Sequence, residues 1–186
     1  MSVLAGARHR LSVGPAARGL SDLAVVLDVG LVIPDGAFRV VEDDTYHVLS
    51  AEPGFHPVVD HPMRVLTAAW SAQPTLPGSV IIRHRRSPEL LAVVYDLSAS
   101  PPTCEQWVFR CLAGILEAVE ERQSAELELP VLGWRLRAQT EEDFGRLLAT
   151  AIARHPVRYL RRVVVPGDRS LLDGIKRGVD SVSRRD

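Results

Sequence analysis

Polar and small residues that could bind a ligand follow several apolar runs of this chain, where open α/β sheets form their binding crevices. The set comprises Asp28, Gly30, Ser98, Ser100, Thr103, Gly133, Trp134, Arg135 and Thr140. Two predicted helices begin near Thr103 and Thr140, and their unpaired amides would face an anion. Arg135 could pair with a phosphate and Trp134 could stack on a base. The pattern predicts a site for a nucleotide or another phosphate-containing small molecule.

The same positions also have a simpler interpretation as ordinary elements of a fold. Thr103 and Thr140 are of a type that commonly caps helices, the serines would be linker, and Trp134 would cover the edge of the sheet. Asp28 is the only acid in an otherwise apolar strand, and an exposed strand end accounts for it. Both interpretations stay open on the sequence alone.

Two further clusters could hold a metal or an anion. His56, Asp60 and His61 lie close together, but Pro57 argues against a helix between the histidines and no fourth ligand is evident. Asp60 fits better as the cap of a helix, so we expect no metal site. The basic run at residues 83–86 lacks interleaved aromatic side chains and lies at a predicted hairpin tip, which favours a solvated turn.

Covalent catalysis has few candidate nucleophiles in this chain. There is no Gly-x-Ser-x-Gly motif, and the spacing of Cys104 and Cys111 places both on the buried face of a helix. Lysine occurs once, at Lys176, against 21 arginines, and asparagine does not occur. We therefore expect a non-catalytic protein that uses no cofactor.

Length and composition predict one domain over residues 1–186, with an irregular segment at 1–22, a core at 23–165 and a C-terminal helix at 168–184. A chain of 186 residues that is 46% hydrophobic can bury a core without disulfides or metals. The net charge of −1 argues against binding to nucleic acid or to an acidic membrane. No apolar run is long enough to cross a membrane and the first residues lack the apolar core of a signal peptide, so we expect a cytoplasmic protein.

Apolar periodicity places the candidate residues on alternating strands and helices. Residues 23–30 form a continuous apolar run, and the Pro-Asp-Gly turn at 34–36 makes residues 37–41 its predicted hairpin partner. Glu42, Asp43 and Asp44 are then expected to form a solvated acidic patch. The other predicted elements are strands at 10–13, 79–83, 90–97, 127–132 and 160–165, and helices from Asp60, at 103–123, at 140–154 and from Asp168. This order predicts a three-layer α/β/α sandwich with a mixed central sheet.

From residue 76 to 165 the chain resembles the macrodomain family, whose members bind ADP-ribose and related nucleotides. The resemblance rests on LPGSVII from Leu76, LLAVVYD from Leu90, LPVLG from Leu129, the helices between them and the Val-rich strand from Leu160. It implies a macrodomain-like fold with a ligand crevice at the carboxyl ends of the strands.

Three motifs that hold the ligand in this family are missing here. The Gly-Asp pair of the first loop corresponds to Gly14 and Pro15, the Asn-Ala-x-Asn stretch to residues 27–30, and the glycine-rich loop to Gly133 followed by Trp134. The resemblance therefore implies that a nucleotide-like or other anionic ligand is bound without turnover. The alternative is an interaction or scaffold protein with a filled, degenerate pocket, which could form a homo-oligomer through the helix from Asp168 or pack that helix on its own sheet.

Overall fold

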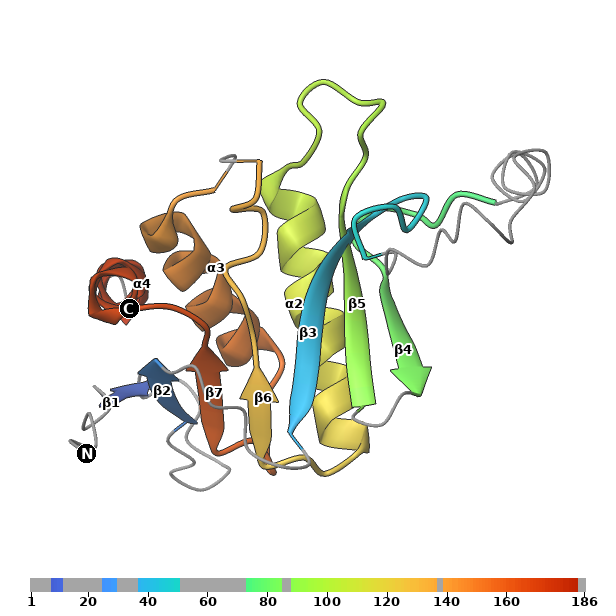
Figure 1. Cartoon of the computed structure of the whole chain (residues 1–186). Coiled ribbons are helices and arrows are strands. Elements are labelled where there is room, and N and C mark those ends of the chain that lie inside the picture. The colour runs from blue at the N-terminus through green and yellow to red at the C-terminus, as the bar shows by residue number, and fades with distance from the viewer. Residues whose placement is uncertain are drawn as a thin grey trace, which may run out of the picture.

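The computed structural model describes residues 8–11, 25–29, 37–50, 73–84, 88–136 and 139–183. Within these ranges, seven strands form one sheet in the order β1-β2-β7-β6-β3-β5-β4 (Figure 1). The strands are β1 (Arg8–Leu11), β2 (Val25–Val29), β3 (Phe38–Asp44), β4 (Val80–His84), β5 (Pro88–Tyr95), β6 (Glu126–Glu128) and β7 (Arg162–Val165). The helices are α2 (Glu105–Glu121), α3 (Glu141–Arg154) and α4 (Arg169–Ser183).

The sheet is mixed, which confirms the α/β class. β4 and β5 form the predicted antiparallel hairpin, and β1 pairs antiparallel with β2. The five strands from β2 to β5 in the sheet order run parallel to one another. In Figure 1, α2 and α3 lie behind the sheet and α4 lies beside α3. The helix expected from Asp60 lies outside the described residues.

The predicted hairpin between residues 23–30 and 37–41 is wrong. β3 lies between β6 and β5 and is parallel to both, while β2 pairs with β7. A turn signal specifies only a local reversal of the chain. A strand with Phe38 and Val40 buried at 4% and 2% exposure gains more by packing in the middle of the sheet, where neighbours cover it.

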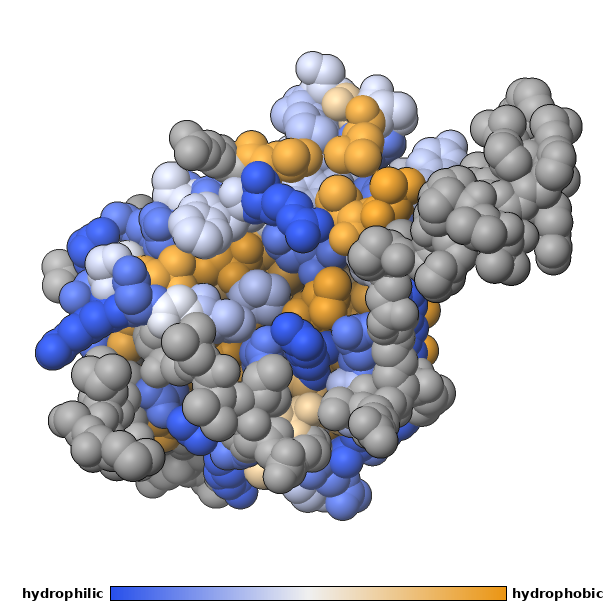
Figure 2. All heavy atoms as spheres, viewed as in Figure 1, coloured by the Kyte–Doolittle hydropathy of each residue, from blue (hydrophilic) through white to orange (hydrophobic). Residues whose placement is uncertain are grey.

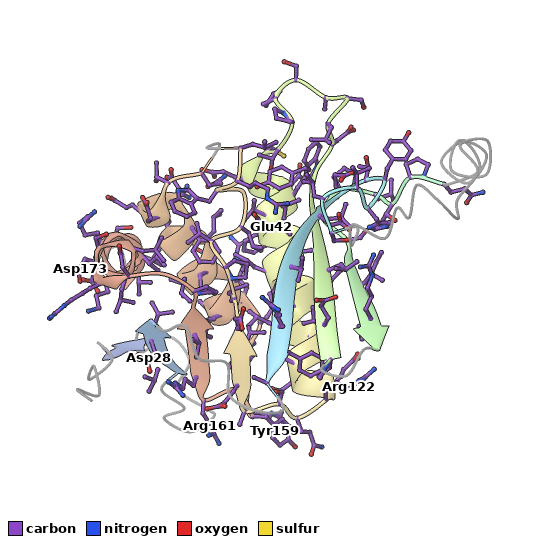
Figure 3. The ribbon with its side chains drawn as sticks, in the orientation of Figure 1. Asp28, Glu42, Arg122, Tyr159, Arg161 and Asp173 are labelled. Atoms are coloured by element: carbon purple, nitrogen blue, oxygen red, sulfur yellow. The ribbon has the colours of Figure 1, made fainter. Side chains whose placement is uncertain are left out.

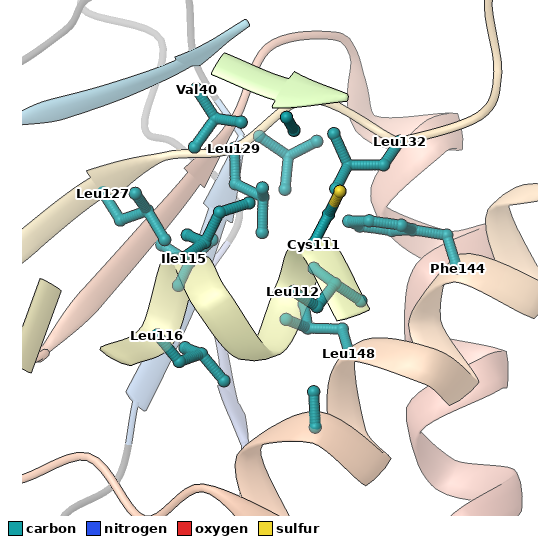
Figure 4. Close-up of a cluster of buried hydrophobic side chains, with 14 of the residues drawn as sticks. Val40, Cys111, Leu112, Ile115, Leu116, Leu127, Leu129, Leu132, Phe144 and Leu148 are labelled. Atoms are coloured by element: carbon teal, nitrogen blue, oxygen red, sulfur yellow. The ribbon is translucent and has the colours of Figure 1, made fainter. Parts of the chain in front are cut away.

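The core lies between the sheet and the two helices behind it. The apolar stripe of α2, with Leu112, Ile115 and Leu116, packs with β3, β6 and α3 residues (Figure 4). Cys111 belongs to this cluster, and burial raises the pKa of its thiol to about 12, so that it is inert as a nucleophile. The prediction for Cys104 is wrong: it is the half-buried N-cap residue of α2 and does not lie on the buried face.

The closing helix α4 packs against α3 through its apolar stripe, which includes Leu172 and Ile175. The structure gives Gly178 of this helix a packing role. A Cβ atom at Gly178 would overlap the backbone carbonyl oxygen of Glu142, and one at Gly145 of α3 would overlap that of Ile175. The two helices therefore approach backbone to backbone. Among the described residues, no helix is long and apolar enough to cross a membrane.

Candidate functional site

The carboxyl ends of β3, β5, β6 and β7 lie at one edge of the sheet, the upper edge in Figure 1, because these strands are parallel. The described segments that follow them are residues 45–50, 96–104, 129–136, 139–140 and 166–168. We call this region the carboxyl edge. Parallel strands thus bring together the loops that the sequence singled out.

Several predicted ligand residues at the carboxyl edge already have partners. The hydroxyl of Ser98 donates to Oδ1 of Asp96 at 2.6 Å, which, together with the Ser98 amide, lowers the pKa of that carboxyl. Thr140 is the N-cap residue of α3: its Oγ1 accepts from the amide of Asp143 at 3.1 Å. For Ser98 and Thr140, the simpler interpretation as turn and cap accounts for the side chain.

Other predicted residues are placed differently. Ser100 and Arg135 are exposed, and Trp134 retains 49% of its surface. Thr103 is 2% exposed and precedes the N-cap residue of α2, so that it is not the cap itself. Gly133 is buried, and Gly30 lies outside the described residues.

Asp28 is not at an exposed strand end, as the sequence led us to expect, but is 3% exposed inside the sheet. Its Oδ2 accepts from Nη2 of Arg162 at 2.7 Å and from Nε at 3.1 Å. This hydrogen bond raises the pKa of the Arg162 guanidinium. The pair forms because β2 and β7 are neighbours, a fact that local sequence does not reveal. Asp28, which is labelled in Figure 3, is thus accounted for by an ion pair between strands.

The prediction that the three acids at the end of β3 form a solvated patch is wrong. The strand continues through them, and Asp43 and Asp44 are 0% and 1% exposed. Acids are rarely buried unless they are paired or hydrogen-bonded, and these carboxylates accept hydrogen bonds from the surrounding loops. Their position at the carboxyl end of a strand with buried apolar residues was the signal that could have identified them.

Glu42 joins three segments of the carboxyl edge. Its Oε1 accepts from the amide of Gly133 at 2.5 Å and from the phenol of Tyr95 at 3.0 Å. Burial raises the pKa of Glu42, and these hydrogen bonds and the charge of Arg135 oppose the rise only in part. Burial and the adjacent Glu42 also raise the pKa of Tyr95, which therefore remains a donor. Figure 3 shows Glu42 in the upper part of β3. Its carboxylate accepts a hydrogen bond from a backbone amide of the loop after β6, so this amide already has an acceptor.

Asp44 shapes the loop that follows β3. Its Oδ1 accepts from the amide of Tyr46 at 2.8 Å, and its Oδ2 accepts from the amides of Val48 and Leu49, both at 2.9 Å. Three backbone donors on one buried carboxylate hold residues 45–50 in a fixed conformation.

Three buried polar atoms of the carboxyl edge have no hydrogen-bond partner in the described structure: Thr45 Oγ1, Thr103 Oγ1 and Gln139 Oε1. A fourth such atom, Glu128 Oε2, belongs to a side chain that pairs with Arg39 through its other oxygen. Native proteins leave few buried polar atoms unpaired, since each costs about 1–3 kcal/mol. Their concentration on the loops after β3, β5 and β6 marks this edge as a place where polar partners are missing.

The two helices that begin at the carboxyl edge differ in electrostatics. The first turn of α3 carries Glu141, Glu142 and Asp143, so its N-terminus is already compensated by negative charge. The N-cap residue of α2, Cys104, makes no side-chain capping bond, and only one acid follows it in the first turn. An anion would therefore meet less competition at α2.

The exposed surface of the carboxyl edge is partly apolar. Leu97 and Leu136 retain 52% and 41% of their surface. Figure 2 shows orange side chains gathered at the top of the molecule, over the loops that follow β3 and β5. Within the described ranges, no group of three His, Cys, Asp or Glu residues could hold a metal, and the His56–His61 cluster lies outside them.

No family model and no curated protein matches this chain. Its structure is similar to that of the Oceanobacillus iheyensis macrodomain with MES bound, at a TM-score of 0.67 and 13% identity over 97% of this chain and 100% of that one. The same macrodomain with ADP gives 0.66 and 13% over 97% and 99%. The Trypanosoma brucei macrodomain in complex with ADP gives 0.53 and 12% over 85% and 68%. The chain thus has a macrodomain-like fold, strongly diverged in sequence, as the resemblance predicted.

Proposed function

We propose that this chain with a macrodomain-like fold is a binding module that holds a nucleotide-like or other phosphate-containing small molecule at the carboxyl edge without turning it over. The unpartnered buried atoms of Thr45, Thr103 and Gln139 carry the proposal. A ligand with hydroxyl, amide or phosphate groups would supply partners to atoms that the chain itself leaves unpaired. Structures of two similar macrodomains contain ADP, which is consistent with a nucleotide-like ligand.

The charges of the edge favour one orientation of such a ligand. The amide of Gly133 is occupied by Glu42, and the N-terminus of α3 is surrounded by acids, so neither favours a phosphate. The N-terminus of α2, with the hydroxyl of Thr103 beside it, is the better place for the anionic group. The half-exposed ring of Trp134 is available to stack on a base.

Calorimetric titration with ADP-ribose, NAD, ADP and inorganic phosphate tests this proposal on the intact chain. We expect saturable binding of at least one nucleotide, weakened about tenfold in Thr103→Val, the factor that one hydrogen bond of roughly 1.4 kcal/mol supplies. Ser98→Ala is the matched control, because its hydroxyl already donates to Asp96 and its loss should leave affinity unchanged. The absence of binding at millimolar ligand would contradict the proposal.

A second candidate, a scaffold with a filled pocket, is favoured by the carboxylate of Glu42 on the amide of Gly133. In that case the exposed apolar side chains of Leu97 and Leu136 would contact a protein or a second copy of the chain. Sedimentation velocity over a range of concentrations distinguishes the two. Self-association without nucleotide binding supports the scaffold, and nucleotide binding by a monomer supports the first proposal.

A further inference from the structure

A hydroxyl, an imidazole and a carboxylate form a chain of hydrogen bonds beside the end of β3. Nε2 of His47 lies 2.9 Å from Oγ1 of Thr75, and its Nδ1 lies 2.6 Å from Oδ2 of Asp43. We propose that these three residues form a relay in which His47 activates the hydroxyl of Thr75 as a nucleophile toward esters with small apolar acyl groups. This inference does not depend on the proposed nucleotide site.

The carboxylate of Asp43 sets the direction of the relay. Its Oδ1 accepts from the amides of Asp44 at 3.0 Å and Ser50 at 3.1 Å, and its Oδ2 accepts from the Ser50 hydroxyl at 2.7 Å. Together with His47, four donors use the four lone-pair positions of a carboxylate that is completely buried. Asp43 is therefore an acceptor throughout, and Nδ1 of His47 must carry the proton in the bond between them. In the neutral imidazole the remaining nitrogen, Nε2, then presents its lone pair to the hydroxyl of Thr75.

The backbone holds His47 in this position at some cost. Its φ of 61° lies in the left-handed region, which non-glycine residues seldom adopt. Its amide donates to the carbonyl of Asp44 at 3.0 Å, and the neighbouring amides of Tyr46 and Val48 bind the Asp44 side chain. Strained residues held by their surroundings are typical of functional sites. Thr75 is fixed as well, because its amide donates to the carbonyl of Thr45 at 2.8 Å.

The surroundings of the relay indicate the class of substrate. Tyr46 and Val48 flank His47 in sequence and retain 52% and 62% of their surface, and Leu76, which follows Thr75, retains 77%. The side chain of His47 is itself 27% exposed. Exposed apolar side chains that adjoin the relay residues along the chain, next to a partly exposed imidazole, favour an uncharged ester with a short apolar acyl chain over a charged substrate.

The chemistry balances without a cofactor. Oγ1 of Thr75 attacks the carbonyl carbon of the ester and its proton passes to Nε2 of His47, while Asp43 stabilises the imidazolium that forms. The bond from the carbonyl carbon to the leaving oxygen breaks, and that oxygen takes the proton from Nε2. The product is an acylated Thr75, which a water molecule can release as the acid by the same proton transfers.

A fluorophosphonate probe and p-nitrophenyl butyrate test this relay on the full chain. The probe should form a phosphonyl ester at Thr75 with loss of fluoride, located by peptide mass spectrometry. Labelling should disappear in Thr75→Val, persist in Thr75→Ser and become about 100-fold slower in His47→Gln, the smallest contribution typical of a general base. Release of p-nitrophenol from the butyrate should follow the same order. The surface hydroxyl of Ser98, which donates to the carboxylate of Asp96 and not to an imidazole, serves as an internal control and should stay unmodified.

A purely structural role for these hydrogen bonds would lower stability on substitution but would not produce an adduct. If His47→Gln does not fold, labelling of the wild type in and out of denaturing urea replaces it, since the relay exists only in the folded chain. No adduct at position 75 of the folded wild type, or labelling at an equal rate without His47, overturns the inference. Because labelling is measured without nucleotide, its failure leaves the result of the calorimetric test unaffected.

Discussion

Substitution of Glu42 by alanine and by glutamine should have opposite consequences, because the two variants remove different properties of the side chain. Alanine removes the acceptor of the Gly133 amide and of the Tyr95 hydroxyl. Both donors belong to buried residues, and an orphaned buried donor costs about 1–3 kcal/mol. We expect Glu42→Ala to lower the free energy of unfolding by about 2–4 kcal/mol.

Glutamine keeps an oxygen that can accept both bonds, removes the charge and places an NH2 group where the second oxygen was. Since burial raises the pKa of Glu42 above its ordinary 4.5, the folded protein holds this proton to a higher pH than the unfolded chain does. The contribution of Glu42 to folding is therefore complete below pH 4.5 and is lost as the pH rises through the folded value. Glu42→Gln should accordingly gain stability relative to the wild type as the pH is raised from 4.5 to 8.

Urea unfolding followed by tryptophan fluorescence, at several pH values between 4.5 and 8, measures these differences. Tyr95→Phe is the matched control for one of the two hydrogen bonds and should cost less than Glu42→Ala, because it leaves only an acceptor that Gly133 still occupies. If Glu42→Gln lost as much stability as Glu42→Ala at neutral pH, or if its difference from the wild type shrank with rising pH, this account of Glu42 would be refuted.

Three further substitutions test the packing of two helices, an ion pair of the sheet and a helix cap. Gly178→Ala should lower the free energy of unfolding by about 1–3 kcal/mol, because overlap with the Glu142 carbonyl outweighs the gain of about 1 kcal/mol in helix propensity. Gly114→Ala, whose new methyl group meets only the side chain of Val80, should lower it less. A more stable Gly178→Ala would contradict the close packing of α3 and α4. Arg162→Met should lower the free energy of unfolding by about 1–3 kcal/mol, because it removes the cation that pairs with the buried Asp28. The double variant that also carries Asp28→Asn should lose less stability than Arg162→Met alone in the same denaturation experiment. Thr140→Ala should lower the free energy of unfolding by about 1 kcal/mol and Thr140→Ser should hardly change it, as thermal unfolding can measure. Equal losses in the two variants would argue against a helix cap in which Thr140 accepts from the amide of Asp143.

Local patterns predicted the helices and the hairpin well because those elements depend on near neighbours. The apolar stripe of α3, with Phe144, Leu147 and Leu148, is buried as its periodicity indicates, and Thr140 caps the helix as its position suggests. The β4–β5 hairpin likewise joins segments a few residues apart. In each case the interactions that stabilise the element lie within one or two turns of the chain.

The buried acids of the sheet were predicted less well because their burial depends on strands that are distant in sequence. Glu42 bonds to Gly133 across 91 positions, and Asp28 to Arg162 across 134. A run of three acids is typical of solvated loops. The donors to Asp43 and Asp44 lie only one to seven positions away, but they converge on buried carboxylates because of the conformation of residues 45–50, which residue types alone do not reveal. The pairing of β3 with β5 and β6 decides the burial of these acids, and that pairing is a property of the whole sheet.

The acids of β3 also change what the edge can bind. Glu42 occupies the amide of Gly133, Asp43 that of Ser50, and Asp44 three amides of the following loop, so backbone donors that could contact a phosphate already hold carboxylates. A phosphate at these donors would have to displace a tethered carboxylate and would also meet the repulsion of its charge. At the N-terminus of α2, in contrast, the Cys104 cap makes no side-chain bond and the buried hydroxyl of Thr103 has no partner. An anionic ligand is therefore directed to the β5–α2 side of the edge, and binding there should be weakened by Thr103→Val but little changed by Glu42→Gln, as calorimetry with the same nucleotide can measure.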